Sequence, residues 1–71
     1  MKAIVIVGKK NIDAHQGIFE SLEKISEQVI LRDNEYHFYS RDGVLMTMIC
    51  TLLDHEIEYS LNFANNKIFQ K

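Results

Sequence analysis

The chain has 71 residues, with 8 Lys and Arg against 10 Asp and Glu and a single cysteine, Cys50. This length allows one domain, which we expect to span residues 1–71, and one cysteine excludes an internal disulfide. The mildly acidic balance argues against an extended nucleic-acid interface, which requires concentrated positive charge. No apolar run reaches the length of a signal peptide or a membrane span, so we expect a soluble cytoplasmic protein with no membrane partner.

The first half of the chain predicts a strand, a helix and a two-stranded hairpin. Residues 3–7 are a continuous apolar run that ends at Gly8, as expected of a central strand. Residues 9–12 are predicted to be a loop, and apolar residues at helical spacing then favour an amphipathic helix over about 13–27. Two further strands are predicted at residues 29–32 and 36–39, with Asp33-Asn34 as the turn between them.

The second half is harder to assign at residues 44–53, where eight of ten residues are apolar and none is charged. We predict a helix, since ten residues is long for a strand, although the turn-forming Arg41-Asp42-Gly43 before them leaves a strand open. Apolar and polar residues alternate over 57–63, which predicts a last strand with one apolar face. Asn65-Asn66 then indicates a turn, and residues 67–69 a brief return strand.

The predicted order is β-α-β-β-α-β. It favours a ferredoxin-like sandwich, an α/β (α+β) fold with two helices on one face of a four-stranded sheet. The start of the chain also resembles ACT-type regulatory domains, in Lys2-Ala3-Ile4-Val5-Ile6-Val7-Gly8 followed by Gly17-Ile18-Phe19. This resemblance implies a ferredoxin-like module of a kind that often dimerises and binds a small ligand near its first strand-helix loop.

A second resemblance covers residues 39–59, which are similar to the first strand-helix-strand unit of glutaredoxins. It rests on Tyr39-Ser40-Arg41-Asp42-Gly43, Leu52-Leu53-Asp54 and Ile57-Glu58-Tyr59. In that family two cysteines open the helix in a C-x-x-C motif, but the matching positions here are Val44 and Thr47, and neither can form a thiolate. The family's cis-proline is also missing, because the chain has no proline. The resemblance implies an alternative fold, a thioredoxin- or glutaredoxin-like fragment, and a redox-inactive relative.

One candidate ligand site lies between the first strand and the first helix. Gly8, Lys9, Lys10 and Asn11 would place backbone N–H groups and two cations where a phosphate or carboxylate could bind. The alternative is a solvated turn, because a single glycine is not a nucleotide-binding fingerprint.

No catalytic or metal-binding centre is visible in the sequence. The three histidines, His15, His37 and His55, lie far apart, and His55 sits in an acidic turn typical of a surface residue. Cys50 lies in an apolar segment, where a free cysteine behaves as a small hydrophobe. We therefore expect a non-enzymatic protein with no metal and no cofactor.

The segment 44–53 carries more apolar surface than one face of a sheet needs. As a helix it would turn one arc toward the core and leave an adjoining stripe formed by Met46, Cys50 and Leu53. The side chains of that stripe are either buried by packing within this small domain or exposed as a surface that binds another molecule. His37 and Tyr39 would lie on the open face of the sheet, a position where RNA-recognition domains stack bases. The acidic balance argues against nucleic acid there and favours a protein partner.

These observations predict a protein-interaction module, a homodimer that inhibits or modulates another protein, of the accessory type found in phages and mobile elements. Self-association is expected because a core of this size supplies only about 3–5 kcal/mol of net stability. The predicted interface residues are Met46, Cys50, Leu53, His37 and Tyr39. The alternatives are an ACT-like domain that binds a small ligand and a redox-inactive glutaredoxin-like protein.

Overall fold

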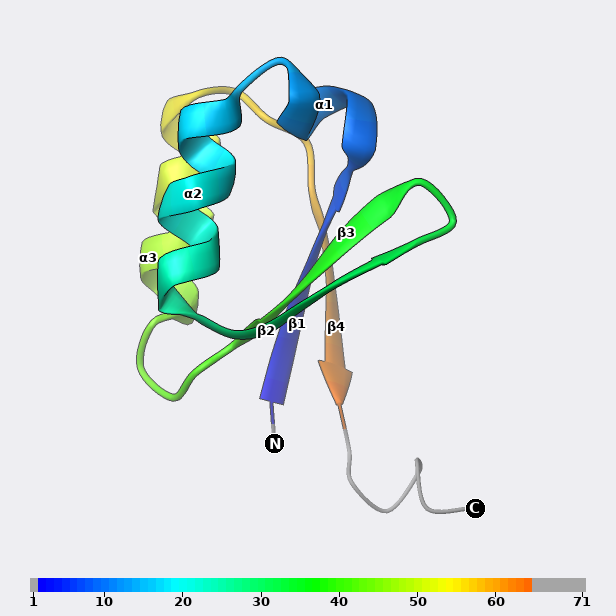
Figure 1. Ribbon diagram of the computed structural model, residues 1–71. Coiled ribbons are helices and arrows are strands. Elements are labelled where there is room, and N and C mark those ends of the chain that lie inside the picture. The colour runs from blue at the N-terminus through cyan, green and yellow to red at the C-terminus, as the bar shows by residue number, and fades with distance from the viewer. Residues whose placement is uncertain (1, 65–71) are drawn as a thin grey trace.

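The sheet and its helices are built by residues 2–64, which are the residues that a computed structural model describes (Figure 1). Together they form a mixed α/β fold with one four-stranded antiparallel sheet and three helices. The strands are β1 (Lys2–Gly8), β2 (Ser26–Arg32), β3 (Glu35–Ser40) and β4 (Ser60–Ala64). The helices are α1 (Lys9–Asp13), α2 (Gln16–Ile25) and α3 (Leu45–Asp54).

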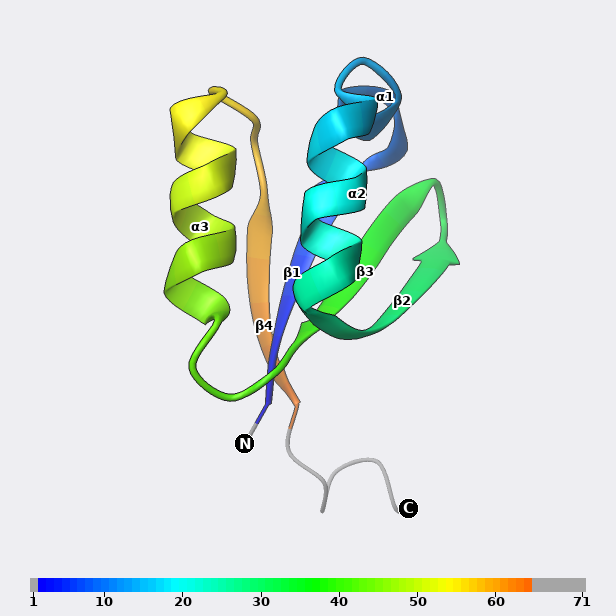
Figure 2. The same ribbon diagram turned by 60° about the vertical axis from the view of Figure 1, so that its left-hand side comes forward.

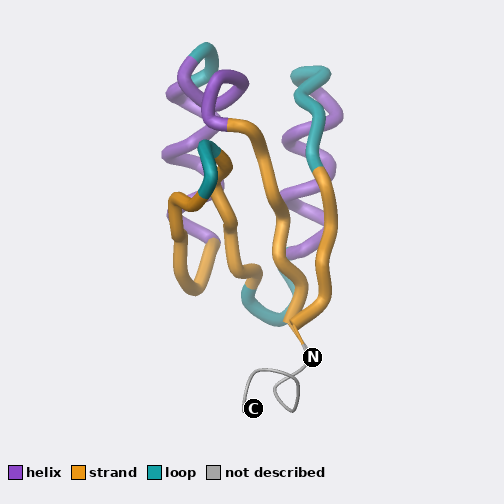
Figure 3. Tube along the Cα trace, turned by 90° about the vertical axis from the view of Figure 1, so that its right-hand side faces the viewer, coloured by secondary structure: helices purple, strands orange, loops and turns teal. Residues whose placement is uncertain are grey.

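The strand order in the sheet is β2-β3-β1-β4, and each strand is antiparallel to its neighbours. Strands β1 and β3 are therefore central, and β2 and β4 form the two edges. Helices α2 and α3 lie side by side on one face of the sheet (Figures 1 and 2). Seen from the other side, the strands lie in front of both helices, so neither α2 nor α3 covers that face (Figure 3).

The core lies between this helix pair and the sheet. Its fully buried side chains come from four elements: Val5 and Val7 of β1, Phe38 of β3, Leu22 of α2, and Met48 and Leu52 of α3. Burying a side chain of this kind contributes about 1.5–3 kcal/mol. Aromatic contacts extend the core toward the hairpin, where the ring of Phe19 lies 5.0 Å from that of Tyr36 and 5.9 Å from that of Phe38.

The apolar run of the first strand is confirmed as central strand β1. Val5 and Val7 point toward the helices, so Ile4 and Ile6 point to the opposite face, because side chains alternate along a strand. Ile4 is only 6% exposed there, where it pairs across the ladder with Tyr39. The side chains on both faces of residues 3–7 are thus at least partly shielded from solvent, which explains why this run is apolar throughout.

The predicted loop at residues 9–12 is wrong, because these residues form α1. The side chain of Ile12 is 2% exposed and belongs to the core, so tertiary packing holds a turn of helix in a locally polar stretch. The next helix, predicted over about 13–27, is present as the shorter α2. The chain leaves helical geometry at Ser26, whose hydroxyl donates a 2.6 Å hydrogen bond to the Leu22 carbonyl, and β2 begins there rather than at residue 29.

The turn at Asp33-Asn34 is confirmed. Its two residues have positive φ values of 54° and 62°, the conformation of a type I′ hairpin turn. Asp and Asn tolerate this left-handed region better than most residues, which is why the pair is a useful turn signal. The hairpin joins β2 to β3, and β3 contains the predicted strand over 36–39.

The helix predicted over 44–53 is confirmed as α3, which spans Leu45–Asp54, and the alternative strand at this position is wrong. Gly43 precedes the helix with φ 85°, so a glycine suits this turn. The last strand begins at Ser60, three residues later than predicted, because Glu56 has a positive φ of 56° and the following residues cross to the sheet as an irregular segment. The predicted turn at Asn65-Asn66 and return strand at 67–69 lie outside the described residues.

Candidate functional site

The outward side of α3 carries an exposed apolar stripe. Met46 is 64% exposed and Leu53 is 59% exposed, and the thiol-bearing Cys50 between them is also exposed. The three residues are spaced i, i+4 and i+7, so they follow one line along the helix. We call Met46, Cys50 and Leu53 the α3 outer stripe. The predicted stripe is therefore exposed rather than consumed by packing within the described residues.

Few polar or charged groups lie on α3 around this stripe. α3 carries no charged residue before Asp54 at its end. The hydroxyl of Thr51 donates a 2.9 Å hydrogen bond to the Thr47 carbonyl, so it is engaged within the helix itself. An exposed, uncharged and largely apolar helix face is the kind of surface that marks an interaction site.

Two further exposed apolar side chains lie on β4. Leu61 pairs with Val5 and Phe63 with Ala3, and cross-strand partners point to the same face of a sheet, so both side chains lie on the face that carries the helices. Leu61 is nevertheless 37% exposed and Phe63 57% exposed. The sequence predicted that they lie on the apolar face of a strand, and said nothing of how far that face is covered. The signal it lacked is the position of β4 at the edge of the sheet.

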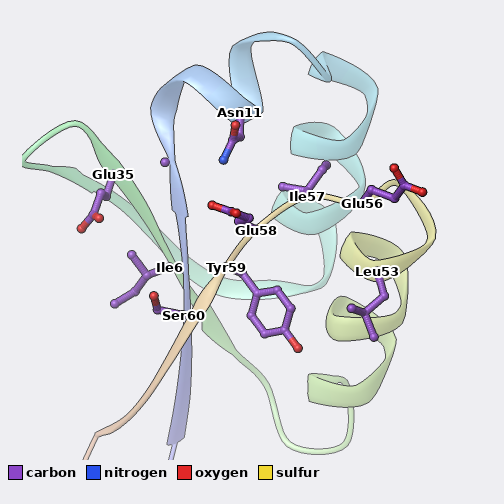
Figure 4. A pocket seen from close by; sticks show the side chains of 10 residues that line it. Ile6, Asn11, Glu35, Leu53, Glu56, Ile57, Glu58, Tyr59 and Ser60 are labelled. Carbon is purple, nitrogen blue, oxygen red and sulfur yellow. The ribbon is translucent and has the colours of Figure 1, made fainter.

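A hollow of about 570 Å³ borders the α3 outer stripe (Figure 4). Leu53 and Tyr59 are among the residues that line it, and Tyr59 points toward α3 on the side that carries Leu53. Glu35 and Glu56 lie at opposite ends of the hollow, so these carboxylates do not converge on one point. Across residues 2–64, no group of three or more His, Cys, Asp or Glu side chains is placed to hold a metal ion.

His37 and Tyr39 lie on the other face of the sheet from the α3 outer stripe. Phe38 between them is fully buried beneath the helices, so its two neighbours point to the uncovered face, where both are partly exposed. The five predicted interface residues thus form two separate surfaces. The structure brings Met46, Cys50 and Leu53 together and leaves His37 and Tyr39 apart from them.

The predicted anion loop is the start of α1. The backbone N–H of Lys9 donates a 2.8 Å hydrogen bond to the Asn34 carbonyl, and the Lys9 ammonium lies 2.8 Å from the Asp13 carboxylate. The hydrogen bond that the Lys9 ammonium donates to the Asp13 carboxylate, and then the charge of Asp13, raise the pKa of Lys9 above its ordinary value. A hollow of about 580 Å³ at this end of the molecule is lined by Gly8, Lys9, Lys10 and Asn11 and also by Asp13, Asp33, Asn34 and Glu35. Its cations are therefore matched by carboxylates, and anion binding stays a prediction.

Two histidines that are distant in sequence meet in space. The rings of His15 and His55 lie 6.4 Å apart in an edge-on arrangement. The Nδ1 atom of His15 lies 3.1 Å from the Asn11 carbonyl, and that of His55 lies 3.0 Å from the Thr51 carbonyl. This contact joins the start of α2 to the end of α3. No local sequence pattern predicts it, because the two residues lie far apart along the chain.

Comparison of the chain with known protein families, curated proteins and solved structures finds no match. The ACT-like and glutaredoxin-like resemblances therefore gain no support from a relative. Within residues 2–64, no helix has both the length and the apolar character needed to cross a membrane.

Proposed function

We propose that this protein is a non-enzymatic interaction domain that binds another protein through the α3 outer stripe. The observation that carries the proposal is the exposure of Met46 and Leu53 on a helix whose opposite side already fills the core. Fully burying such a side chain is worth about 1.5–3 kcal/mol, so a partner that covers the stripe gains a substantial part of its binding energy there. Methionine suits a partner surface because its flexible thioether adapts to irregular contacts.

The proposed mode of action is inhibition or modulation by binding. A helix face inserted into an apolar groove of a partner is a common mode of recognition, read as anchors at i, i+4 and i+7. The hollow beside Leu53 would accept a side chain of the partner at one end of the stripe. An accessory protein of a phage or mobile element fits the size and composition of the chain.

At the level of the fold, we propose a ferredoxin-like arrangement with an added helix. Its support is that β1 and β2 both flank β3, while β3 and β4 both flank β1, as two interleaved β-α-β units require. The short helix α1 is an addition to that simple pattern. This assignment concerns architecture and carries no function with it.

The test is affinity purification of the full chain from its native host, with quantitative mass spectrometry. Met46→Glu and Leu53→Glu each place a charge on the α3 outer stripe at a position that is largely exposed. Ser21→Glu is the matched control, because it adds the same charge to an exposed position of α2. We expect one or a few proteins to co-purify with the wild type and the control and to be lost from both stripe variants. The same set of proteins with all four baits would contradict the proposal.

A further inference from the structure

The two edges of the sheet differ in how they are protected against pairing with another strand. Edge strand β2 has an irregular register between Ser26 and Gln28, and it carries the charged residues Glu27 and Arg32. Bulges and charges are the usual devices that keep an exposed edge from joining a second sheet. Strand β2 is therefore a guarded edge.

Strand β4 has none of these devices. Its five residues, Ser60 to Ala64, include no charge and no proline, and its pairing with β1 runs without a register shift. Strand β4 ends the sheet in the part of the chain that the structure describes, so its outer side presents backbone donors and acceptors along about 17 Å. Leu61 and Phe63 add exposed apolar side chains beside that edge.

We infer that β4 pairs antiparallel with β4 of a second copy of this chain, so that the two sheets become continuous. A two-fold axis through Asn62 makes the strand complementary to itself. Leu61 then faces the partner subunit's Phe63 on the helix-covered side, and Phe63 faces the partner subunit's Leu61. Asn62 meets its own counterpart on the uncovered side, where two amides can hydrogen-bond.

A second copy fits this edge better than an unrelated segment for two reasons. The first is that β4 carries no charged residue. Pairing two copies of β4 therefore creates no repulsion between like charges. A stable interface also takes about 800 Å² from each partner, roughly a sixth of the 5028 Å² surface of this chain. Edge pairing contributes to that area through backbone contacts along β4 and through the apolar contacts of Leu61 and Phe63.

This inference goes beyond the proposed function and does not rest on it. The dimer uses β4, whereas binding of another protein uses the α3 outer stripe, so either can fail alone. The first experiment compares Phe63→Lys with Leu31→Lys in the full chain. Leu31 is the matched control because it is 50% exposed, apolar, and on the same face of the guarded edge strand β2.

Sedimentation velocity across a wide concentration range reads out the oligomeric state. The wild type and Leu31→Lys are expected to dimerise equally. Phe63→Lys is expected to weaken dimerisation on the order of 100-fold, because each substitution is present twice across a two-fold interface. Circular dichroism confirms that both variants are folded, which is expected because both side chains are more exposed than the core.

A crosslinking experiment tests the register of the pairing. In a Cys50→Ser background, Asn62→Cys places two thiols opposite each other at the two-fold axis, at a separation close to that of a disulfide. Gln28→Cys is the control on β2, exposed and on the same uncovered face of the sheet. Mild oxidation should give a covalent dimer from Asn62→Cys and none from Gln28→Cys.

Two results would overturn the inference. One is a wild type that stays monomeric at every concentration. Another is a dimer that persists in Phe63→Lys and does not crosslink through Asn62→Cys, which places the contact elsewhere. In the monomeric case, protection of all β4 amides from hydrogen exchange would mean that another part of the same chain covers this edge.

Discussion

The two sides of α3 carry the same residue types in opposite environments. Met48 and Leu52 are fully buried against the sheet and α2, whereas Met46 and Leu53 are 64% and 59% exposed. Hydrophobicity alone therefore does not place a residue of this helix inside the protein. The buried pair accounts for the fold, and the exposed pair is surface that the fold does not use. This contrast is the basis of the proposed function.

The strongest test of the contrast is alanine substitution at the adjacent leucines. Leu52→Ala is expected to cost about 2–5 kcal/mol, because it leaves a cavity in the core. Leu53→Ala should change the free energy of unfolding by less than about 0.5 kcal/mol. Urea unfolding followed by circular dichroism measures both. Equal costs at the two positions would mean that Leu53 is part of the core and not of a binding surface.

A second test compares two glycines: Gly43, in the turn before α3, and Gly17, within α2. Gly43→Ala is expected to destabilise by about 1–2 kcal/mol, because residue 43 has φ 85°. Gly17→Ala should stabilise by about 0.5–1 kcal/mol, since Gly17 lies in a helix with no neighbour within 4 Å of an added methyl group. Thermal melts of the two variants should shift in opposite directions. Shifts in the same direction would contradict the backbone geometry described at one of these positions.

The reactivity of the Cys50 thiol measures how accessible the exposed side of α3 is to solvent. Cys50→Ser is expected to alter stability by less than about 0.5 kcal/mol, because the side chain is exposed. In the wild type, a thiol reagent should label Cys50 under native conditions as readily as in urea. Binding of the partner should slow that labelling. Slow labelling of the protein without that partner would instead show that Cys50 is already covered.

The smallest effect is expected at α1, which an exposed ion pair supports. The pKa of Lys9 is raised by Asp13, so this pair contributes to stability below the unfolded pKa of 10.5 and loses its contribution as pH rises through the folded value. Asp13→Asn should remove this alkaline dependence. Thermal melts of wild type and variant from pH 7 to above the Lys9 pKa make the comparison. Parallel pH profiles would show that the pair contributes nothing measurable, as many surface pairs do.

The sequence predicted the elements whose signals are local. The apolar run of β1, the Asp33-Asn34 turn and the helix over 44–53 all follow from residue type and spacing. Helix α1 was missed because it depends on the burial of Ile12 against the rest of the core, a contact that no local pattern shows. The exposure of Leu61 and Phe63 could not be predicted, because alternation along a strand tells which side chains share a face, but not that β4 lies at the edge of the sheet.

The candidate site was predictable only where its signal is local in the sequence. A surplus of apolar residues on one helix can be counted in the sequence, so Met46, Cys50 and Leu53 emerged as a stripe. That His37 and Tyr39 lie on the opposite face from this stripe depends on how the sheet is assembled. Likewise, the contact between His15 and His55 depends on the packing of two helices.

The most direct measurement is site-specific photo-crosslinking in the native host. A photoreactive amino acid replaces Met46 on the α3 outer stripe or, as the control, Ser21 on α2. The proposal predicts a discrete covalent adduct with another protein from position 46, absent from position 21 and lost when Leu53→Glu is added. The absence of such an adduct at position 46, or the same adducts from both positions, would contradict the role assigned to the exposed side of α3.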